Sequence, residues 1–168
     1  AICAMLRPNC LPAVVVCPAS LKHVWQHEAA SHFGIRAEVL EGMDPPKHPP
    51  RCDLLVVNYD VLTPSRYGKG WAEALKGINP STIILDECQY ISSPKAKRSK
   101  ACRWLTKDIP HVLALSGTPM MNRPSELWSV LNMVRPDLFK SAWPFLHRFA
   151  GPRRAPWGWE FKGATNLD

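Results

Sequence analysis

Two adjacent carboxylates, Asp86 and Glu87, directly follow an apolar run in the stretch STIILDECQYIS at residues 81–92. Acidic residues at the end of a buried strand have two common uses. One carboxylate can hold Mg²⁺, usually through water, while its neighbour orients the water that attacks a nucleotide phosphate. Alternatively, an Asp at a strand end caps the helix that follows it. The pair alone does not distinguish these two uses.

A second polar stretch, LALSGTP at residues 113–119, comes later in the chain at the end of another apolar run. Ser116 and Thr118 place hydroxyl groups on a Gly-Pro turn, where they can hydrogen-bond the loop that contains Asp86 and Glu87. An ordinary turn between a strand and a helix can have the same sequence. The two stretches together are much more specific than either one.

Short apolar runs alternate with helical patterns along the chain, and this order predicts the fold. Strands are expected at 12–17, 36–42, within 52–62 with an end near Asn58 and Tyr59, at 81–87 and at 111–119, and helices at 21–33, around 71–75, at 93–107 and at 125–134. The proline-rich stretch 42–51 is expected to be a surface loop. Together these elements predict an α/β fold with a parallel sheet and helices on both faces. Ligands of such sheets bind beyond the carboxyl ends of the strands.

Composition limits the classes of protein that remain. A length of 168 residues suits one domain, and a hydrophobic share of 46% with seven tryptophans is enough for a packed core. The chain has neither an apolar run long enough for a membrane helix nor a recognisable secretory signal, so we expect an intracellular protein. Six cysteines without a CxxC pair indicate buried thiols rather than disulfides or a zinc site, and the net charge of +7 suits nucleic acid.

The stretches IILDECQ and LALSGTP together resemble motifs II and III of the superfamily-two helicases. VVVCPASLKHVWQHE is similar to motif Ia of the Swi/Snf-type DNA translocases, and LLVVNYDVL is similar to the next strand of that family. SGTPMMNRPSELWSVLNMVRPDLF continues in the family's pattern, and PRRAPWGWEFKGATNL resembles a segment of its annealing-helicase branch. The resemblance covers nearly the whole chain. It implies a RecA-like fold of the P-loop NTPase type, of which this chain would be the N-terminal helicase lobe.

The resemblance also implies roles in an ATP site. Asp86 would coordinate the Mg²⁺ of Mg-ATP, and Glu87 would be the catalytic base that polarises water. Cys88 and Gln89 stand where the family more often has a small residue and His. A Gln side chain can still make a hydrogen bond, so Gln89 is kept as a site residue.

Two further groups of residues receive roles from the resemblance. Residues of the second motif would link hydrolysis to movement between two motor lobes: Ser116, Gly117 and Thr118. Residues of motif Ia would lie at the DNA backbone, where contacts carry no sequence information: Pro18, Ser20 and Leu21, with Lys22 either a helper or a solvated helix residue.

The chain contains no G-x-x-x-x-G-K-[ST] sequence, the glycine-rich loop that cradles nucleotide phosphates. The stretch RYGKGW at 66–71 contains Gly-Lys but does not match. In the family the phosphate loop and its helix precede motif Ia, and AICAML resembles the end of that helix. We therefore expect the chain to begin just after its phosphate loop and a second RecA-like lobe to follow it, with a first lobe at 1–150 and a tail segment at 151–168.

These observations predict part of a DNA-dependent ATPase motor that translocates on duplex or branched DNA and remodels or reanneals it, in the nucleus if the source is eukaryotic. The alternative is a degenerate RecA-like module that serves as a DNA-binding or protein-interaction platform without hydrolysis. The intact pair of Asp86 and Glu87 argues against it. The basic run at 95–107 is either a solvated surface or a phosphate-tracking patch, and Trp157 and Trp159 either pack or stack on bases.

Overall fold

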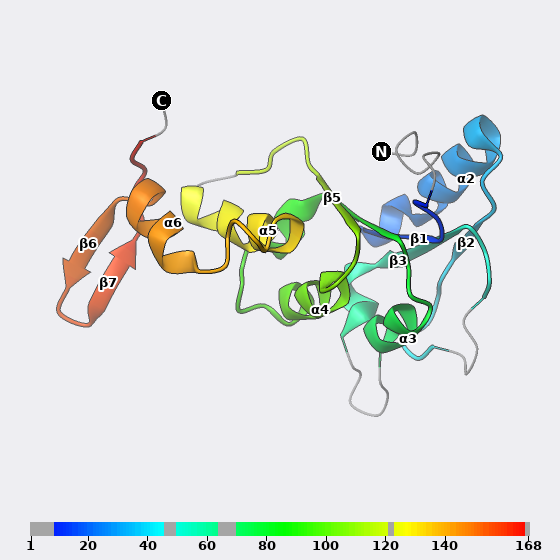
Figure 1. Cartoon of the computed structure of the whole chain (residues 1–168), viewed down its shortest axis with the longest axis horizontal. Coiled ribbons are helices and arrows are strands. Elements are labelled where there is room, and N and C mark those ends of the chain that lie inside the picture. The colour runs from blue at the N-terminus through cyan, green and yellow to red at the C-terminus, as the bar shows by residue number, and fades with distance from the viewer. Residues whose placement is uncertain (1–8, 46–49, 64–69, 121–122, 167–168) are drawn as a thin grey trace.

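The computed structural model of the chain describes residues 9–45, 50–63, 70–120 and 123–166. Its centre is a five-stranded parallel sheet with the strand order β2-β3-β1-β4-β5 (Figure 1). The strands are β1 (Ala13–Cys17), β2 (Ala37–Val39), β3 (Leu54–Asn58), β4 (Thr82–Asp86) and β5 (His111–Leu115). The central strand, β1, pairs in parallel with β3 on one side and β4 on the other. The expected parallel α/β sheet is therefore confirmed.

Successive residues of β1 alternate between two apolar clusters, one on each face of the sheet. Val14 and Val16 belong to one cluster, and Ala13, Val15 and Cys17 belong to the other. Side chains of a strand point alternately to opposite faces, so a continuous apolar run fills both. All five residues of β1 have no exposed surface, and both faces of the sheet must therefore be covered.

Helices cover both faces of the sheet, as the sequence predicts (Figure 1). The helices are α2 (Lys22–Phe33), α3 (Trp71–Gly77), α4 (Lys97–Thr106) and α5 (Leu127–Val134). Helix α2 packs on one face through the partly buried Trp25 and Phe33. Leu75 of α3 and Leu105 of α4 are fully buried on the other face. Burying a leucine side chain of this kind stabilises the fold by about 1.5–3 kcal/mol.

Short 3₁₀ helices turn the chain as it leaves the sheet, and they explain where two of the predicted elements end or begin. They are η1 (Ala19–Leu21), η2 (Tyr59–Leu62), η3 (Cys88–Ile91) and η4 (Pro124–Glu126). The strand within 52–62 ends at Asn58, close to the predicted end, because the next residues form η2 and bury Tyr59, Val61 and Leu62 together. The helix predicted from residue 125 is likewise preceded by η4, which begins at Pro124.

The C-terminal part contains elements that the sequence analysis did not predict: α6 (Ala142–Phe149) and a hairpin of β6 (Pro152–Ala155) and β7 (Gly158–Phe161). Helix α6 begins after Ser141, whose side-chain oxygen accepts a hydrogen bond from the Trp143 backbone N–H at 3.3 Å. The two strands form an antiparallel sheet separate from the main one. A lone two-stranded hairpin is marginally stable in water, so its contacts with α6 matter for its order.

The described cysteines are all free: Cys10, Cys17, Cys52, Cys88 and Cys102. Four are buried as predicted, and Cys52 is half-buried. Some of the other sequence predictions concern residues outside the described ranges: Cys3, the segment AICAML, part of the loop at 42–51 and most of RYGKGW. Within the described ranges, no helix combines the length and the apolar character needed to cross a membrane.

Candidate nucleotide and DNA site

Asp86 is the last residue of β4 and lies beside Leu115, the last residue of β5. Its carboxylate is half-buried and accepts two hydrogen bonds, one on each oxygen. The indole Nε1–H of Trp25 donates to Oδ2 at 2.8 Å, and the backbone N–H of Glu87 donates to Oδ1 at 3.0 Å. Each carboxylate oxygen has a second lone pair, so the group is held in position and can still accept a further ligand.

Glu87 has a left-handed backbone conformation, with φ of 52° and ψ of 52°. This conformation is uncommon for a residue with a long side chain and persists where the surroundings enforce it, often at functional sites. Glu87 is also the residue that precedes η3, and no side chain caps that helix. The helix-capping explanation for Asp86 is therefore not what the structure shows.

A chain of hydrogen bonds joins the ends of β4 and β5. The Gln89 Nε2–H donates to Oε2 of Glu87 at 2.7 Å, and the Ser116 hydroxyl donates to Oε1 of Gln89 at 2.6 Å. The backbone N–H of Thr118 in turn donates to the Ser116 hydroxyl oxygen at 3.0 Å. Because one amide group is both donor and acceptor in this chain, the position of Glu87 depends on the position of the Ser116 turn.

Gly117 and Thr118 are exposed on this turn. A Cβ atom built on Gly117 would meet nothing within 4 Å, and its φ lies outside the left-handed region. The described structure gives no steric reason for glycine at this position. The coupling role predicted for Ser116, Gly117 and Thr118 stays a prediction.

Two residues that the sequence analysis did not assign to the site contact Asp86. Trp25 lies on α2, and Tyr59 directly follows β3, where its hydroxyl donates to the backbone carbonyl of Asp86 at 2.8 Å. Burial raises the pKa of the Tyr59 phenol far above its ordinary value, so it remains a neutral donor. The rule that ligands bind at strand ends would have identified Tyr59. The helical spacing of Trp25 indicated only packing.

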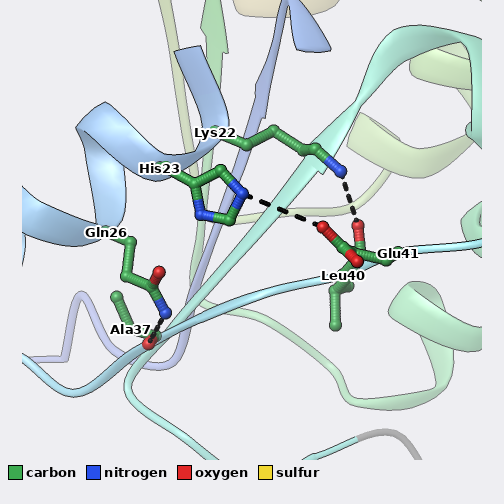
Figure 2. Close-up of polar contacts among 6 residues, drawn as sticks. All are labelled: Lys22, His23, Gln26, Ala37, Leu40 and Glu41. Atoms are coloured by element: carbon green, nitrogen blue, oxygen red, sulfur yellow. Dashed lines mark hydrogen bonds and ion pairs between the residues drawn. The ribbon is translucent and has the colours of Figure 1, made fainter. Parts of the chain in front are cut away.

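The residues predicted to contact DNA follow directly after β1. Pro18 is half-buried, Ser20 is exposed on η1, and the half-buried Leu21 packs against the apolar cluster beneath α2. The ammonium group of Lys22 donates a hydrogen bond of 3.2 Å to the backbone carbonyl of Leu40 (Figure 2). Lys22 is therefore not a freely solvated helix residue, although two of its three N–H groups remain for another acceptor.

Figure 2 shows that two neighbouring side chains of α2 also reach the segment that begins with β2. The amide of Gln26 donates to the backbone carbonyl of Ala37 at 3.1 Å, and Nε2 of His23 lies 3.8 Å from Oε1 of Glu41. Together with Lys22 these contacts fasten the start of α2 to the edge of the sheet. The protein segment predicted to contact DNA, residues 18–22, is therefore held in place against the edge of the sheet.

The Asp86 carboxylate suits a magnesium ion that takes most of its ligands from water and nucleotide phosphates. Carboxylate oxygen is a preferred ligand of Mg²⁺. In the part of the chain that the structure describes, no group of three or more His, Cys, Asp or Glu residues is placed to hold a metal. Mg²⁺ is commonly bound through one or two carboxylates, with water and nucleotide phosphates supplying the rest. The residues present fit Mg²⁺ on those terms.

The basic run after η3 divides into packed and solvated residues. The Arg98 guanidinium lies 5.5 Å from the ring centre of Tyr90, and Arg103 Nε donates to Oδ1 of Asn132 at 3.0 Å. The lysines of the run are exposed: Lys95, Lys97, Lys100 and Lys107. Both interpretations of this run therefore stay open, and the exposed lysines are the members best placed to meet phosphate.

A parallel α/β sheet with linked polar groups at the ends of β4 and β5 is the arrangement expected of the RecA-like domains of nucleic-acid motors. The model of the SNF2-related domain family matches residues 5–165. The chain therefore belongs to the SNF2-related domain family, which confirms the resemblance to Swi/Snf-type superfamily-two translocases.

Individual relatives agree with this assignment. The chain is 32% identical over 160 residues to the SWI/SNF-related matrix-associated actin-dependent regulator of chromatin subfamily A-like protein 1 of Xenopus tropicalis. That alignment covers 94% of this chain and 16% of the relative. The chain is also 34% identical over 149 residues to the TATA-binding protein-associated factor mot1 of Aspergillus fumigatus. This second alignment covers 84% of the chain and 7% of that protein.

The fold matches the SWI2/SNF2 ATPase core of Sulfolobus solfataricus in complex with double-stranded DNA, with a TM-score of 0.71 and 28% sequence identity. The match covers 86% of this chain and 29% of the solved chain. The expected RecA-like fold is confirmed. The chain thus spans about a sixth of the Xenopus relative's length and under a third of the solved core.

Proposed function

We propose that this chain forms the N-terminal lobe of a DNA-dependent ATPase motor that translocates on duplex or branched DNA and remodels or reanneals it. The observation that carries the proposal is the hydrogen-bonded chain from Asp86 through Glu87 and Gln89 to Ser116, in a domain that belongs to the SNF2-related family. Such a hydrogen-bonded chain links the carboxylates suited to ATP hydrolysis with a turn whose position can respond to hydrolysis.

In the proposed reaction Asp86 would hold a magnesium ion, which would neutralise charge on the phosphates of ATP. Glu87 accepts a proton from the attacking water, and its carboxylate is kept in place by the Gln89 amide at 2.7 Å. A positioned general base contributes about 10²–10⁴-fold in rate. Because the chain contains no glycine-rich phosphate loop, that loop and a charge-stabilising arginine would come from other parts of the motor.

The same arrangement supports coupling between hydrolysis and movement. A change at Glu87 alters the hydrogen bond to Gln89, and Gln89 transmits it to Ser116 over 2.6 Å. Gly117 and Thr118 are exposed on the turn and can contact a second lobe. We infer that Gln89 performs the coupling that a His performs elsewhere in the family, because an amide offers both a donor and an acceptor.

DNA would be held at the segment from Pro18 to Lys22. Ser20 offers an exposed hydroxyl, and Lys22 keeps two N–H groups beyond its bond to Leu40. Contacts of this kind bind phosphate and do not read sequence. The Sulfolobus core was solved with double-stranded DNA, which supports DNA as the partner of this chain as well. Such a motor would act inside the cell, and in the nucleus if the source is eukaryotic.

A platform that binds DNA or protein without hydrolysing ATP is the alternative. It would need neither the paired carboxylates nor the left-handed backbone at Glu87. Strained backbone is retained where function requires it, and here the strain lies at the residue proposed as the base. The observed geometry therefore favours the motor.

The proposal is tested by measuring DNA-stimulated ATP hydrolysis and ATP binding in the complete motor that carries this lobe. We expect Glu87→Gln to lower the hydrolysis rate about 10²-fold or more, because the amide keeps the shape and loses the base. ATP binding should stay near the parental value. Glu38→Gln, at an exposed residue of the edge strand β2, makes the same chemical change away from the site and should retain activity. Parental hydrolysis in Glu87→Gln would remove Glu87 from its role.

A further inference from the structure

The hairpin of β6 and β7 lies at the end of the molecule beyond α6, far from the five-stranded sheet (Figure 1). Its base is packed. The Trp159 ring centre lies 5.8 Å from that of Trp143 and 4.8 Å from that of His147, and Phe161 lies 5.5 Å from His147. The hairpin is therefore fixed to α6 through aromatic side chains, and this confirms packing as a role for Trp159.

The turn of the hairpin carries an exposed tryptophan. Trp157 lies in the turn between the strands and is 79% exposed, the largest exposed fraction among the exposed large apolar side chains of the described structure. Its indole N–H donates a hydrogen bond of 3.1 Å to Oε1 of Glu160. This bond fixes the edge of the ring, while most of its surface faces solvent. An exposed tryptophan held in this way is suited to contact another molecule.

The flanks of the hairpin carry positive charge. Arg153 and Arg154 are adjacent residues of β6, so their side chains point to opposite faces of the hairpin. Both are exposed, and neither guanidinium has a hydrogen-bond or ion-pair partner among the described residues. Glu160 is the only acidic residue between positions 142 and 166, and its carboxylate already accepts from Lys162 at 3.1 Å and from Trp157.

The face with Arg153 also contains a cavity of about 460 Å³. Arg153, Lys162 and the carboxylate-bearing Glu160 are among its lining residues. Because Glu160 is paired with Lys162, Arg153 is the cation that remains for a phosphate at this face. The hairpin thus offers positive charge on both faces and an indole at the tip between them.

We propose that this hairpin binds DNA at a branch point or strand end, with Trp157 stacked on an exposed base and Arg153 and Arg154 each facing the backbone of one strand. The faces of bases are covered by neighbouring base pairs in a closed duplex and become available where strands separate. Aromatic side chains stack on such bases without sequence preference. The inference rests on the proposed function in taking DNA as the partner, and it adds the DNA structure that is preferred and the residues that select it.

The test uses the 168-residue chain and two labelled DNA probes of equal duplex length. One is a fork with two unpaired arms, and the other is a duplex closed at both ends by non-nucleotide linkers, so that it has neither free ends nor unpaired bases. Affinity is measured by fluorescence anisotropy over a range of salt concentrations. The parental chain is expected to bind the fork about fivefold or more tightly than the closed duplex, as expected for one stacked base.

Substitutions distinguish the contribution of the Trp157 indole to DNA binding from that of the two arginine charges. Trp157→Ala should remove the preference for the fork, and Trp157→Phe should retain most of it because a phenyl ring still stacks. Arg153→Ala combined with Arg154→Ala should weaken binding to both probes and lower the magnitude of the salt slope by about 1.4–1.8, the value for two lost phosphate contacts. Trp104→Ala on α4 and the pair Arg51→Ala and Lys140→Ala are matched controls at exposed positions outside the hairpin.

Several results would overturn the inference: equal affinity of the parental chain for both probes, no binding to either, or an unchanged fork preference in Trp157→Ala. An unchanged preference would leave the hairpin as a surface for a protein partner. These readings are independent of ATP hydrolysis. If the fork preference does not depend on Trp157 but ATP hydrolysis in the complete motor depends on Glu87, the hairpin inference is wrong and the proposed function stands. If the fork preference depends on Trp157 but hydrolysis does not depend on Glu87, only the proposed motor function is refuted.

Discussion

The indole N–H of Trp25 donates a 2.8 Å hydrogen bond to the carboxylate of Asp86, linking α2 to the end of β4. Helix α2 begins at Lys22, the last residue of the segment proposed to contact DNA, and Asp86 is the proposed magnesium ligand. A shift of α2 on DNA binding would therefore act on the orientation of the carboxylate. This bond offers a direct physical path from DNA to the hydrolytic site.

Trp25→Phe tests this path, because phenylalanine keeps an aromatic ring and removes the donor. Hydrogen bonds to charged groups contribute about 1.5–3 kcal/mol. In the complete motor we expect a loss of roughly tenfold in DNA-stimulated ATPase efficiency and a higher Mg²⁺ concentration for half-maximal rate. The Mg²⁺ titration is informative because a merely structural defect would lower the amount of active protein without shifting that concentration.

Trp104→Phe provides the control for Trp25→Phe. Trp104 lies on α4, is 48% exposed and contacts Lys76 at 5.4 Å from the ring centre. The same substitution there should leave the Mg²⁺ requirement unchanged. If both variants respond alike, or if Trp25→Phe titrates as the parent does, the bond to Asp86 does not position the metal ligand.

The chain of hydrogen bonds through Gln89 predicts that its members act as a unit. Gln89→Ala and Ser116→Ala should each reduce the stimulation of ATPase activity by DNA, and the double variant should be little worse than either one. Residues in a shared network show coupling energies of about 0.5–3 kcal/mol, whereas independent sites add. The measurement is a double-mutant cycle on the ratio of stimulated to basal rate. Strict additivity of the two effects would mean that the 2.6 Å contact carries no coupling.

The sheet could be predicted from the sequence because its strands are continuous apolar runs, such as Ala13–Cys17, separated by helical patterns. The α6 helix and the hairpin were missed for a different reason. Their stability comes from aromatic contacts between residues of separate elements, such as Trp143 and Trp159, and periodicity within one segment does not report such contacts. The Pro-Trp-Gly turn at 156–158 between two short runs was the available signal for the hairpin.

The candidate site shows the same division. Asp86, Glu87 and Ser116 could be found because strand ends collect polar side chains in parallel sheets. Trp25 could not be found in this way, because its ring belongs to a helix and its donor reaches β4 through tertiary packing. The boundary expected at residue 150 stays a prediction, although the described contacts join both sides of it: the Thr165 hydroxyl donates to the Arg148 carbonyl at 2.8 Å.

Cys17, buried at the end of β1, predicts a pH dependence of stability. Burial raises the pKa of its thiol to about 12, with the negative charge of Asp86 adding to the rise and Lys22 opposing it. Below about pH 9 the thiol is protonated in both states and contributes no pH dependence. Between about 9 and 12 the unfolded chain loses this proton while the folded chain keeps it, so the free energy of unfolding falls as pH rises, by about 1.4 kcal/mol per pH unit.

Urea denaturation of the parental chain and of Cys17→Ala at several pH values between about 8 and 11 measures this effect. The slope of stability against pH should be shallower in the variant by the contribution of one thiol. The comparison concerns slopes, so the overall destabilisation from the smaller side chain does not enter. Parallel curves for the two proteins would show that Cys17 ionises equally easily in both states.

Binding of duplex DNA should be independent of sequence and fall steeply as salt increases. The proposed contacts at Ser20 and Lys22 address phosphate, and the exposed lysines of α4 would do the same if they track DNA. Each phosphate neutralised by a cation contributes a slope of about −0.9 in the logarithm of affinity against that of salt concentration. Lys22→Ala should reduce the magnitude of this slope by about one, and Lys140→Ala, at an exposed lysine outside the proposed contacts, serves as the comparison. A flat slope for the parental chain would contradict a phosphate-based contact.

The 168-residue chain on its own should not bind Mg-ATP tightly, because it contains no glycine-rich loop whose backbone amides and lysine would cradle the phosphates. Asp86 offers one carboxylate, and a magnesium ion held by one carboxylate relies on nucleotide phosphates for its other ligands. Without the cradle both the metal and the nucleotide are weakly held, so we expect a dissociation constant no tighter than about 1 mM, or roughly 4 kcal/mol of binding free energy, and no measurable hydrolysis. Calorimetric titration of the chain with Mg-ATP measures this, with Asp86→Asn as the matched variant. Micromolar affinity that survives in Asp86→Asn would reveal a phosphate site elsewhere in the domain, and micromolar affinity that disappears would show that the strand ends suffice to bind the nucleotide without a phosphate loop.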